Sequence, residues 1–409
     1  MAARFILPAL ALAGTAYGMF EKDTKSSIIL TSTIAQCNGT LTINSQSDAS
    51  SISSCTTYTG DVIIGSGVTG TVELDGVSTI SGSFVAKNVT QLTAINAPKL
   101  QEIGGTFDLE ELQIMSTLSM GSLARVNQIN WIALPALQAL SFGSGIREAN
   151  NVYISNTGLT DLNGIELTGV ASMDVNNNQY LKTINVNALT NVTQALSFSA
   201  NGMNLAIEFP NLQAAKNLTF RNVTSVSMPS LADVGGAMGF YSNYFTSFAA
   251  PNLTETAGTI AFVDSPSLSN LSFPSLETIS GGLLLTNNTQ LGSITGFNSL
   301  KTISGDINFY GTFGAVSFNS LSDVKGAATV YTSSDNSTIC NLFNQAKSAQ
   351  VIKGKVTCQT SSSNTAANGT SSSTSSSKTS KAAAVRNINY DPSAPLTGFA
   401  ALIAALLFI

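Results

Sequence analysis

Apolar residues recur along this chain in a unit of about 22 residues that runs from Ser53 to Tyr331. The unit has Leu two residues after its start, Ile or Val at the fifth position, and two alternating apolar residues near the ninth and eleventh. Clear copies begin at Pro98, Pro229 and Pro274. A fixed period of this length is typical of a solenoid, in which each turn stacks on its neighbours. The sequence therefore predicts an all-β, right-handed parallel β-solenoid of about 13 turns.

Thirteen copies of the unit can be aligned, with steps of 19 to 24 residues between them. They begin at Ser53, Asp75, Pro98, Gly121, Ser144, Ile165, Asn187, Pro210, Pro229, Pro251, Pro274, Asn298 and Asn319. The copies that begin at Gly121, Ser144, Ile165 and Pro210 lack one residue before the alternating segment. This deletion indicates that the Gly-Gly of the other copies is an optional bulge.

Alternating pairs such as Phe107/Leu109 and Ile307/Phe309 have the two-residue period of a half-buried strand. Asn or Asp often follows such a pair, because these residues tolerate the left-handed conformation of a tight corner. The predicted corner residues are Asn88, Asn156, Asn177, Asn222, Asn243, Asp264 and Asn287.

The amino-acid composition excludes several kinds of catalytic and binding site. The 409 residues are 10% charged and 43% apolar, and the formal net charge is −5. The absence of histidine excludes Ser-His-Asp and Cys-His catalysis and His-based metal sites. There is no basic patch with interleaved aromatic residues to suggest nucleic-acid binding. We therefore predict no metal site, no cofactor and no nucleic-acid partner.

The four cysteines lie in two pairs, Cys37/Cys55 before the repeats and Cys340/Cys358 after them. Neither pair has the CxxC spacing of a zinc or redox motif. We interpret them as two local disulfides that close the ends of the solenoid. Free buried thiols are the alternative.

The N-terminus resembles a secretory signal over residues 1–18. Arg4 provides the positive charge, Phe5 to Ala13 is an apolar segment too short to span a bilayer, and Ala16 and Gly18 are small residues suited to cleavage. A buried N-terminal helix is the alternative.

The C-terminus changes composition at residue 359. Residues 359–381 are rich in Ser and Thr, which predicts an extended stalk, and residues 382–409 combine small residues, a polar spacer and an apolar tail. This order is typical of a GPI-attachment signal that is removed, with Ala382 as the expected acceptor and Asn387 as an alternative. A single-span tail anchor is the competing interpretation.

Ten N-glycosylation sequons agree with passage through the secretory pathway. They are Asn38, Asn88, Asn191, Asn217, Asn222, Asn252, Asn270, Asn287, Asn336 and Asn368. A corner side chain that turned inward to form a ladder could not carry sugar. We therefore expect Asn88, Asn222 and Asn287 to be less occupied than Asn336 and Asn368.

Several segments together resemble the fungal GPI-anchored cell-wall proteins with receptor-L-domain-like repeats, which are related to the sporulation-specific cell-wall proteins. The matching segments are residues 37–43, 54–55 and 60–64, the Pro-x-Leu-x-x-Ile-x-Gly-Gly repeats, and residues 339–344 and 351–358. The resemblance implies one solenoid over residues 19–358, with an N-terminal cap at 37–55 and a C-terminal cap at 338–358. It also implies a role in the cell wall, at the outer face of the plasma membrane, with no enzymatic activity assigned.

Some β-solenoids cleave polysaccharides, so the residues between the inward pairs were compared for acid pairs. This solvent-facing row reads Ile63, Val85, Asp108, Asn130, Tyr153, Asp174, Ser197, Thr219, Gly239, Ala261, Leu284, Asn308 and Thr329. Asp108 and Asp174 are three turns, about 14 Å, apart, whereas a glycosidase pair needs about 5–9.5 Å. Asp108 and Glu110 alternate on one strand and form the only compact pair. Trp131 could stack on a sugar, but the template places it inward.

The leading hypothesis is a non-enzymatic, GPI-anchored cell-surface glycoprotein that supports cell-wall organisation and integrity. Its expected partners are wall polysaccharide or other wall glycoproteins, together with the outer leaflet of the plasma membrane through GPI. The alternative is a wall-polysaccharide hydrolase or transferase that uses Asp108 and Glu110.

Overall fold

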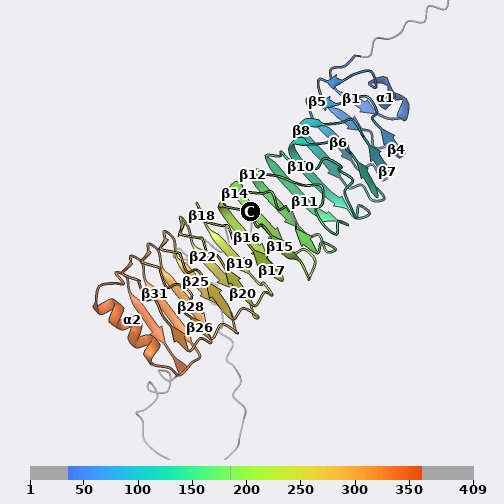
Figure 1. The fold of residues 1–409 in the computed structure, drawn as a ribbon. Coiled ribbons are helices and arrows are strands. Elements are labelled where there is room, and N and C mark those ends of the chain that lie inside the picture. The colour runs from blue at the N-terminus through green and yellow to red at the C-terminus, as the bar shows by residue number, and fades with distance from the viewer. Residues whose placement is uncertain (1–35, 185, 362–409) are drawn as a thin grey trace, which may run out of the picture. The chain divides into compact units, whose positions relative to one another are not determined.

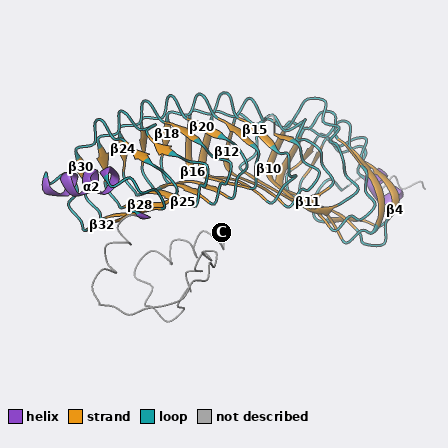
Figure 2. Cartoon of the chain, turned by 90° about the horizontal axis from the view of Figure 1, so that it is seen from below, coloured by secondary structure: helices purple, strands orange, loops and turns teal. Residues whose placement is uncertain are grey.

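The repeats coil into a parallel β-solenoid of about 13 turns, as predicted (Figure 1). The computed structural model describes residues 36–361 except residue 185. The expected signal segment 1–18, most of the stalk 359–381 and the anchor segment 382–409 lie outside the described residues. Figure 2 shows the solenoid as a gently bent rod, with the long strands along the inner side of the bend.

The main sheet has 22 strands in the described part of the chain. They are β1 (Leu41–Ile43), β2 (Thr57–Tyr58), β3 (Val62–Ile64), β5 (Thr79–Ile80), β6 (Phe84–Lys87), β8 (Glu102–Glu110), β10 (Arg125–Leu134), β11 (Asn151–Thr157), β12 (Gly169–Asn176), β14 (Asn191–Ser199), β16 (Ala214–Arg221), β18 (Asp233–Val234), β19 (Met238–Tyr241), β21 (Glu255–Thr256), β22 (Ile260–Val263), β24 (Thr278–Ile279), β25 (Leu283–Thr286), β27 (Thr302–Ile303), β28 (Ile307–Gly311), β30 (Asp323–Val324), β31 (Ala328–Thr332) and β32 (Val356–Gln359).

Shorter strands form four small sheets elsewhere around the turns. These are β4 (Thr69–Glu73), β7 (Gln91–Asn96) and β9 (Thr117–Ser119); β13 (Thr183–Ile184), β15 (Ala206–Glu208) and β17 (Ser225–Ser227); β20 (Ser247–Ala249) and β23 (Asn270–Ser272); and β26 (Ser293–Ile294) and β29 (Ala315–Val316). All of these pairings are parallel and join equivalent positions of successive turns.

The register of the main sheet confirms the template. Asp108 pairs with Val85 on one side and Asn130 on the other, and the solvent-facing row continues turn by turn to Thr329. The optional bulge is also observed, because the register shifts between β8 and β10: the step from Ile103 to Thr106 in β8 pairs with the step from Val126 to Gln128 in β10, which is one residue shorter. A Cβ at Gly105 would lie 2.7 Å from the backbone carbon of Gly82, so only glycine fits this bulge.

The core is a column of apolar side chains, one set from each turn. Phe198, Phe220, Phe240 and Phe262 stack in successive turns, with the rings of Phe240 and Phe262 4.5 Å apart. Equivalent turns place equivalent residues one above another, so a repeated Phe becomes a continuous aromatic stack.

Corner residues adopt positive φ angles, as the sequence predicts for most of them. Asn88, Asn156, Asn177, Asn222, Asp264 and Asn287 have φ between 54° and 59°. The prediction is wrong for Asn243, because the corner of that turn is Ser242, with φ of 53°. Asn243 is instead fully buried one residue further along.

That following position forms a buried polar column, which we call the asparagine ladder: Asn178, Asn201, Asn243, Ser265 and Asn288. Each member bonds to the backbone of the preceding turn. Asn243, for example, accepts a hydrogen bond from the backbone N–H of Val223 at 3.1 Å and donates to the carbonyl of Phe220 at 3.0 Å. The ladder satisfies backbone groups that would otherwise be buried without partners where the chain turns.

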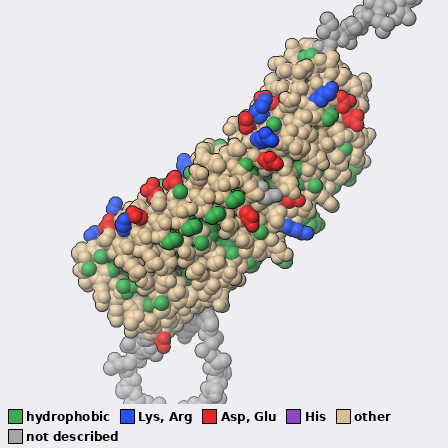
Figure 3. All heavy atoms as spheres, viewed as in Figure 1, with side chains coloured by type: hydrophobic (Ala, Val, Ile, Leu, Met, Phe, Trp, Pro, Cys, Tyr) green, Lys and Arg blue, Asp and Glu red, His purple; other side chains and the backbone are tan. Residues whose placement is uncertain are grey.

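The surface is weakly charged. Figure 3 shows mostly uncharged side chains on the visible face, with Lys, Arg, Asp and Glu gathered along the edge from β31 to β14 and around the N-terminal end. Within residues 36–361, no helix is both long and apolar enough to cross a membrane.

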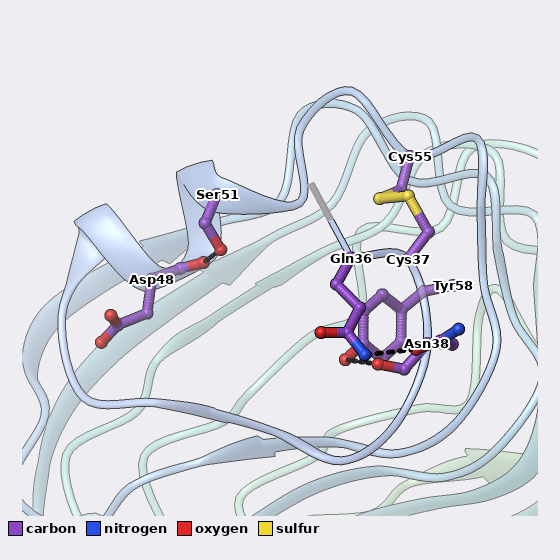
Figure 4. Close-up of a disulfide and its surroundings, with 7 residues drawn as sticks. All are labelled: Gln36, Cys37, Asn38, Asp48, Ser51, Cys55 and Tyr58. Atoms are coloured by element: carbon purple, nitrogen blue, oxygen red, sulfur yellow. Dashed lines mark hydrogen bonds between the residues drawn. A yellow bond between two sulfur atoms is a disulfide. The ribbon is translucent and has the colours of Figure 1, made fainter. Parts of the chain in front are cut away.

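Both ends of the rod are capped and cross-linked. Cys37–Cys55 lies beside the short helix α1 (Gln46–Ser51), and Tyr58 donates from its hydroxyl to the carbonyl of Asn38 nearby (Figure 4). At the other end, Cys340 of helix α2 (Thr338–Ser348) is joined to Cys358 of β32. The predicted disulfide pairing is therefore observed. Phe343 of α2 packs edge-on against Phe309 and covers the last turn of the core.

Candidate functional site

The outward face of the main sheet is the most regular surface of the molecule. Two parallel rows of side chains cover it. The central row is the predicted solvent-facing row from Ile63 to Thr329. The flanking row lies two residues further along each strand and contains Lys87, Glu110, Ile132, Ser155, Asn176, Ser199, Arg221, Tyr241, Val263, Thr286, Tyr310 and Tyr331. Any extended ligand on this face would contact both rows.

The predicted acid pair is held in a cluster of four side chains. The Lys87 Nζ lies 2.8 Å from Asp108 Oδ2 and 2.9 Å from Glu110 Oε1. Asn130 Nδ2 donates to Asp108 at 2.7 Å and to Glu110 at 3.0 Å. The hydrogen bonds to Asp108 and then to Glu110 raise the pKa of Lys87, so the ammonium stays charged at neutral pH. Both carboxylates thus share one counter-ion and one amide donor.

This cluster is a poor arrangement for glycoside cleavage. Glycosidases need one protonated and one ionised carboxyl group on opposite sides of the scissile bond. Here both carboxylates lie on the same face of the sheet and contact the same ammonium and the same amide. The arrangement is that of a surface ion-pair network.

Asp174 is three turns away from Asp108, as predicted. Asn130 and Tyr153 occupy the two intervening turns of the central row. Burial raises the pKa of the Asp174 carboxyl, although Asn176 Nδ2 donates to it at 3.1 Å. A lone carboxylate of this kind has no partner for acid–base catalysis.

Trp131 points inward and is fully buried, so it packs in the core as the template predicts. Its ring meets Phe107 edge-on at 5.6 Å. Its indole N–H has no hydrogen-bond partner within the described residues. Stacking of this ring on a sugar is therefore excluded by its position.

The C-terminal half of the outward face has a different character, which the sequence template did not identify. Here Tyr241, Leu284, Asn308, Tyr310 and Tyr331 form what we call the tyrosine patch. The rings of Tyr310 and Tyr331 stack at 5.2 Å with an interplanar angle of 15°. The ring of Tyr241 lies over Gly239, where a Cβ would come within 2.5 Å of Tyr241 Cε2.

The sequence contained a signal for this patch. The central row already included Leu284 and Asn308, and the same two-residue alternation extended by one step reaches Tyr310 and its neighbours. Restricting the comparison to one row, and to acidic residues, left the flanking tyrosines out.

The described surface otherwise offers few concave or metal-binding sites. One shallow hollow at a corner is lined by Leu162, Gly164, Glu166 and Asn187 among others, with a single carboxylate. In the described part of the chain, no group of three or more Cys, Asp or Glu residues is placed to hold a metal ion.

The sequons differ in how their side chains are used. Asn88 and Asn287 are exposed and do not turn inward, so the reason given for low occupancy does not hold at these two positions. Asn336 is half-buried, and its amide donates to the carbonyl of Gly314 at 2.9 Å. Asn217 similarly donates to a backbone carbonyl of the preceding turn. The acceptors Ala382 and Asn387, and the sequon Asn368, lie outside the described residues.

Comparison with known proteins finds fungal relatives that match most of the chain. The chain is 39% identical over 356 residues to a cell surface GPI-anchored protein of Arthroderma benhamiae, covering 87% of each chain. It is 39% identical to Protein ecm33 of Aspergillus fumigatus, covering 88% of this chain and 86% of that one. The cell wall protein ecm33 of Schizosaccharomyces pombe is 32% identical, with 79% of this chain and 76% of that chain covered. No protein-family model and no solved structure matches the chain.

Proposed function

Because this chain belongs to the family of fungal GPI-anchored cell-surface and cell-wall proteins, we propose that it is a non-enzymatic surface glycoprotein that supports cell-wall organisation and integrity. The observation that carries the proposal is the 39% identity across 87% of both chains to a relative named for its GPI anchor and surface location. The S. pombe relative, named a cell wall protein, supports the role in the wall.

The ends of the chain support the proposed location. Residues 1–18 would direct secretion, residues 359–381 would form the stalk, and residues 382–409 would be exchanged for a GPI anchor at Ala382 or Asn387. The folded part would then stand at the outer leaflet of the plasma membrane or in the wall. Wall polysaccharide and other wall glycoproteins are its proposed partners.

The fold suggests a passive mechanism. Thirteen turns at roughly 4.8 Å per strand give a rod about 60 Å long. Parallel pairing along the rod and a disulfide at each end favour a stiff shape. The rod would present its outward sheet face to the wall at a fixed orientation.

The hydrolase alternative receives no support from the arrangement of Asp108 and Glu110. Both carboxylates are bound to Lys87 and Asn130. A nucleophile or general acid in this position would first have to leave that network.

Two variants of the full chain test the proposal in a strain that lacks the protein. A chain ending at residue 381 should be released into the medium, whereas the full chain stays with the cell envelope. The isosteric double variant Asp108→Asn with Glu110→Gln should restore resistance to wall-perturbing dye as well as the wild type does. Retention of the truncated chain would refute the anchor, and loss of resistance with normal surface amounts of the double variant would restore the enzyme hypothesis.

A further inference from the structure

The outward face of the main sheet changes in charge along the rod. Its N-terminal part contains Lys87, Asp108 and Glu110. From β19 to β31, the central and flanking rows contain no charged side chain at all. The residues there are Tyr241, Gly239, Ala261, Val263, Leu284, Thr286, Asn308, Tyr310, Thr329 and Tyr331. This stretch includes the tyrosine patch and is suited to an uncharged ligand.

Asn308 is the unusual residue of the tyrosine patch. It lies on β28 between the inward residues Ile307 and Phe309, so its side chain belongs to the outward face. The residue as a whole is only 9% exposed, and no described residue bonds its amide. Its amide atoms are not among the buried unpaired polar atoms of the described residues, so they are accessible from the outward face and free to bond a ligand there.

A second unfilled hydrogen bond lies on the adjacent strand. Thr286 of β25 faces outward beside Tyr310 in the flanking row. Its hydroxyl oxygen is buried and has no partner in the described part of the chain. An unpaired hydroxyl beside an accessible amide on the neighbouring strand gives this patch hydrogen-bonding groups that suit a ligand rich in hydroxyls.

Aromatic rings border these polar groups. Tyr310 is 36% exposed, and its ring stacks on that of Tyr331 in the next turn. Exposed tyrosine rings offer an apolar face and a hydroxyl at the edge. The amide of Asn308 offers two donors and an acceptor. Rings beside an amide suit a pyranose sugar, which has apolar C–H faces and a rim of hydroxyl groups.

We propose that the tyrosine patch binds a neutral polysaccharide chain of the cell wall, lying along the rod axis. The inference rests on the proposed function and gives it a ligand-binding surface. The five strands β19, β22, β25, β28 and β31 extend over about 20 Å at roughly 4.8 Å per strand. Several consecutive sugars fit this length, so longer oligosaccharides should bind more tightly than short ones.

The test measures retention of the detergent-solubilised full chain on insoluble β-1,3-glucan, chitin and mannan particles. Tyr310→Ala removes one ring of the patch. The matched control is Tyr153→Ala, because Tyr153 lies on the same sheet face, outside the patch, and is also 36% exposed. We expect Tyr310→Ala to weaken retention on at least one polysaccharide about tenfold, while Tyr153→Ala stays within about twofold of the wild type.

A second variant, Asn308→Leu, separates a role in binding from a role in stability. Leucine has the same number of side-chain heavy atoms as asparagine and removes no hydrogen bond to a described residue, so its urea midpoint should stay close to that of the wild type, while retention falls. If the wild type bound none of the three polysaccharides, or if Tyr310→Ala and Tyr153→Ala bound alike, the inference would be overturned. Attachment of a protein alone to the patch would overturn it as well. Each of these results leaves the anchor and wall tests of the proposed function unaffected.

Discussion

The asparagine ladder predicts a large loss of stability from a single apolar substitution, Asn243→Leu. The Asn243 side chain is fully buried, and it is the only acceptor for the backbone N–H of Val223 among the described residues. Its amide also donates to the carbonyl of Phe220 at 3.0 Å. Leucine has the same number of side-chain heavy atoms in the same branched arrangement, so the substitution removes hydrogen bonds without opening a cavity.

The magnitude follows from those two bonds. Leaving the Val223 N–H buried and unpaired costs about 1–3 kcal/mol. Loss of the bond to Phe220 removes about 0.5–1.5 kcal/mol more. Together they predict that Asn243→Leu lowers the free energy of unfolding by about 1.5–4.5 kcal/mol.

The next turn suggests a milder substitution at the same position. Ser265 takes the same ladder position and accepts from the backbone N–H of Asn243 at 3.2 Å. A serine at position 243 can therefore still accept from Val223, and Asn243→Ser should cost only about 1–2 kcal/mol. The exposed neighbour provides the control, because Tyr244→Leu should stay within about 0.5 kcal/mol of the wild type.

Urea unfolding followed by circular dichroism measures these differences. Solenoids can unfold in segments, so the slope of each transition must be compared along with its midpoint. An Asn243→Leu variant within about 0.5 kcal/mol of Tyr244→Leu would show that the ladder does not stabilise the turns, and the reasoning would fail.

Two further predictions follow from the outward face and the sequons. Burial raises the pKa of Asp174 above its unfolded value near 3.9. The charged carboxylate therefore destabilises the folded state. This loss of stability begins as pH rises through the unfolded pKa and is complete above the folded pKa. Asp174→Asn should therefore raise the urea midpoint at pH 7 but not at pH 3, and an equal change at both pH values would contradict the cause given. Asn217 donates to the carbonyl of Gln194 and accepts from the N–H of Ala237, both at 3.1 Å, so a glycan on its nitrogen would break a bond between turns. Glycopeptide mapping should find Asn217 less occupied than the exposed Asn270, and the reverse order would be evidence against this reading.

Much of the fold could be predicted because the same pattern of apolar and polar positions recurs in every copy of the repeat. Thirteen copies of one template fix which side of each strand is buried, and a one-residue slip would turn all of them outward. The missing residue in the copy that begins at Gly121 even predicts the register shift between β8 and β10. The disulfides follow for a related reason, since only the two ends of a solenoid lack a neighbouring turn and the cysteines lie there.

The candidate site was harder to predict. The template shows which side chains point inward and which point outward, but it does not show which outward side chains are held by residues of neighbouring turns. Asp108 and Glu110 are outward, as expected, yet whether they are free depends on Lys87 from the preceding turn and Asn130 from the following one. Those partners are more than 20 residues away in the sequence, and they become neighbours only through the register.

Asn243 and Asn308 show why residue type alone does not reveal function. Both are asparagines that lie at nearby positions of the repeat template in different turns, and both are more than nine-tenths buried. Asn243 bonds the backbone of the preceding turn, so its burial is fully explained by the fold. The Asn308 amide bonds no described residue, and its polar atoms are accessible from the outward face, so a ligand on that face can bond them. On the same face, the hydroxyl of Thr286 is buried without a partner in the described part of the chain, and the rings of Tyr310 and Tyr331 stack beside it. This is why the surface around Asn308, and not the acid pair, is the one we propose to bind a ligand.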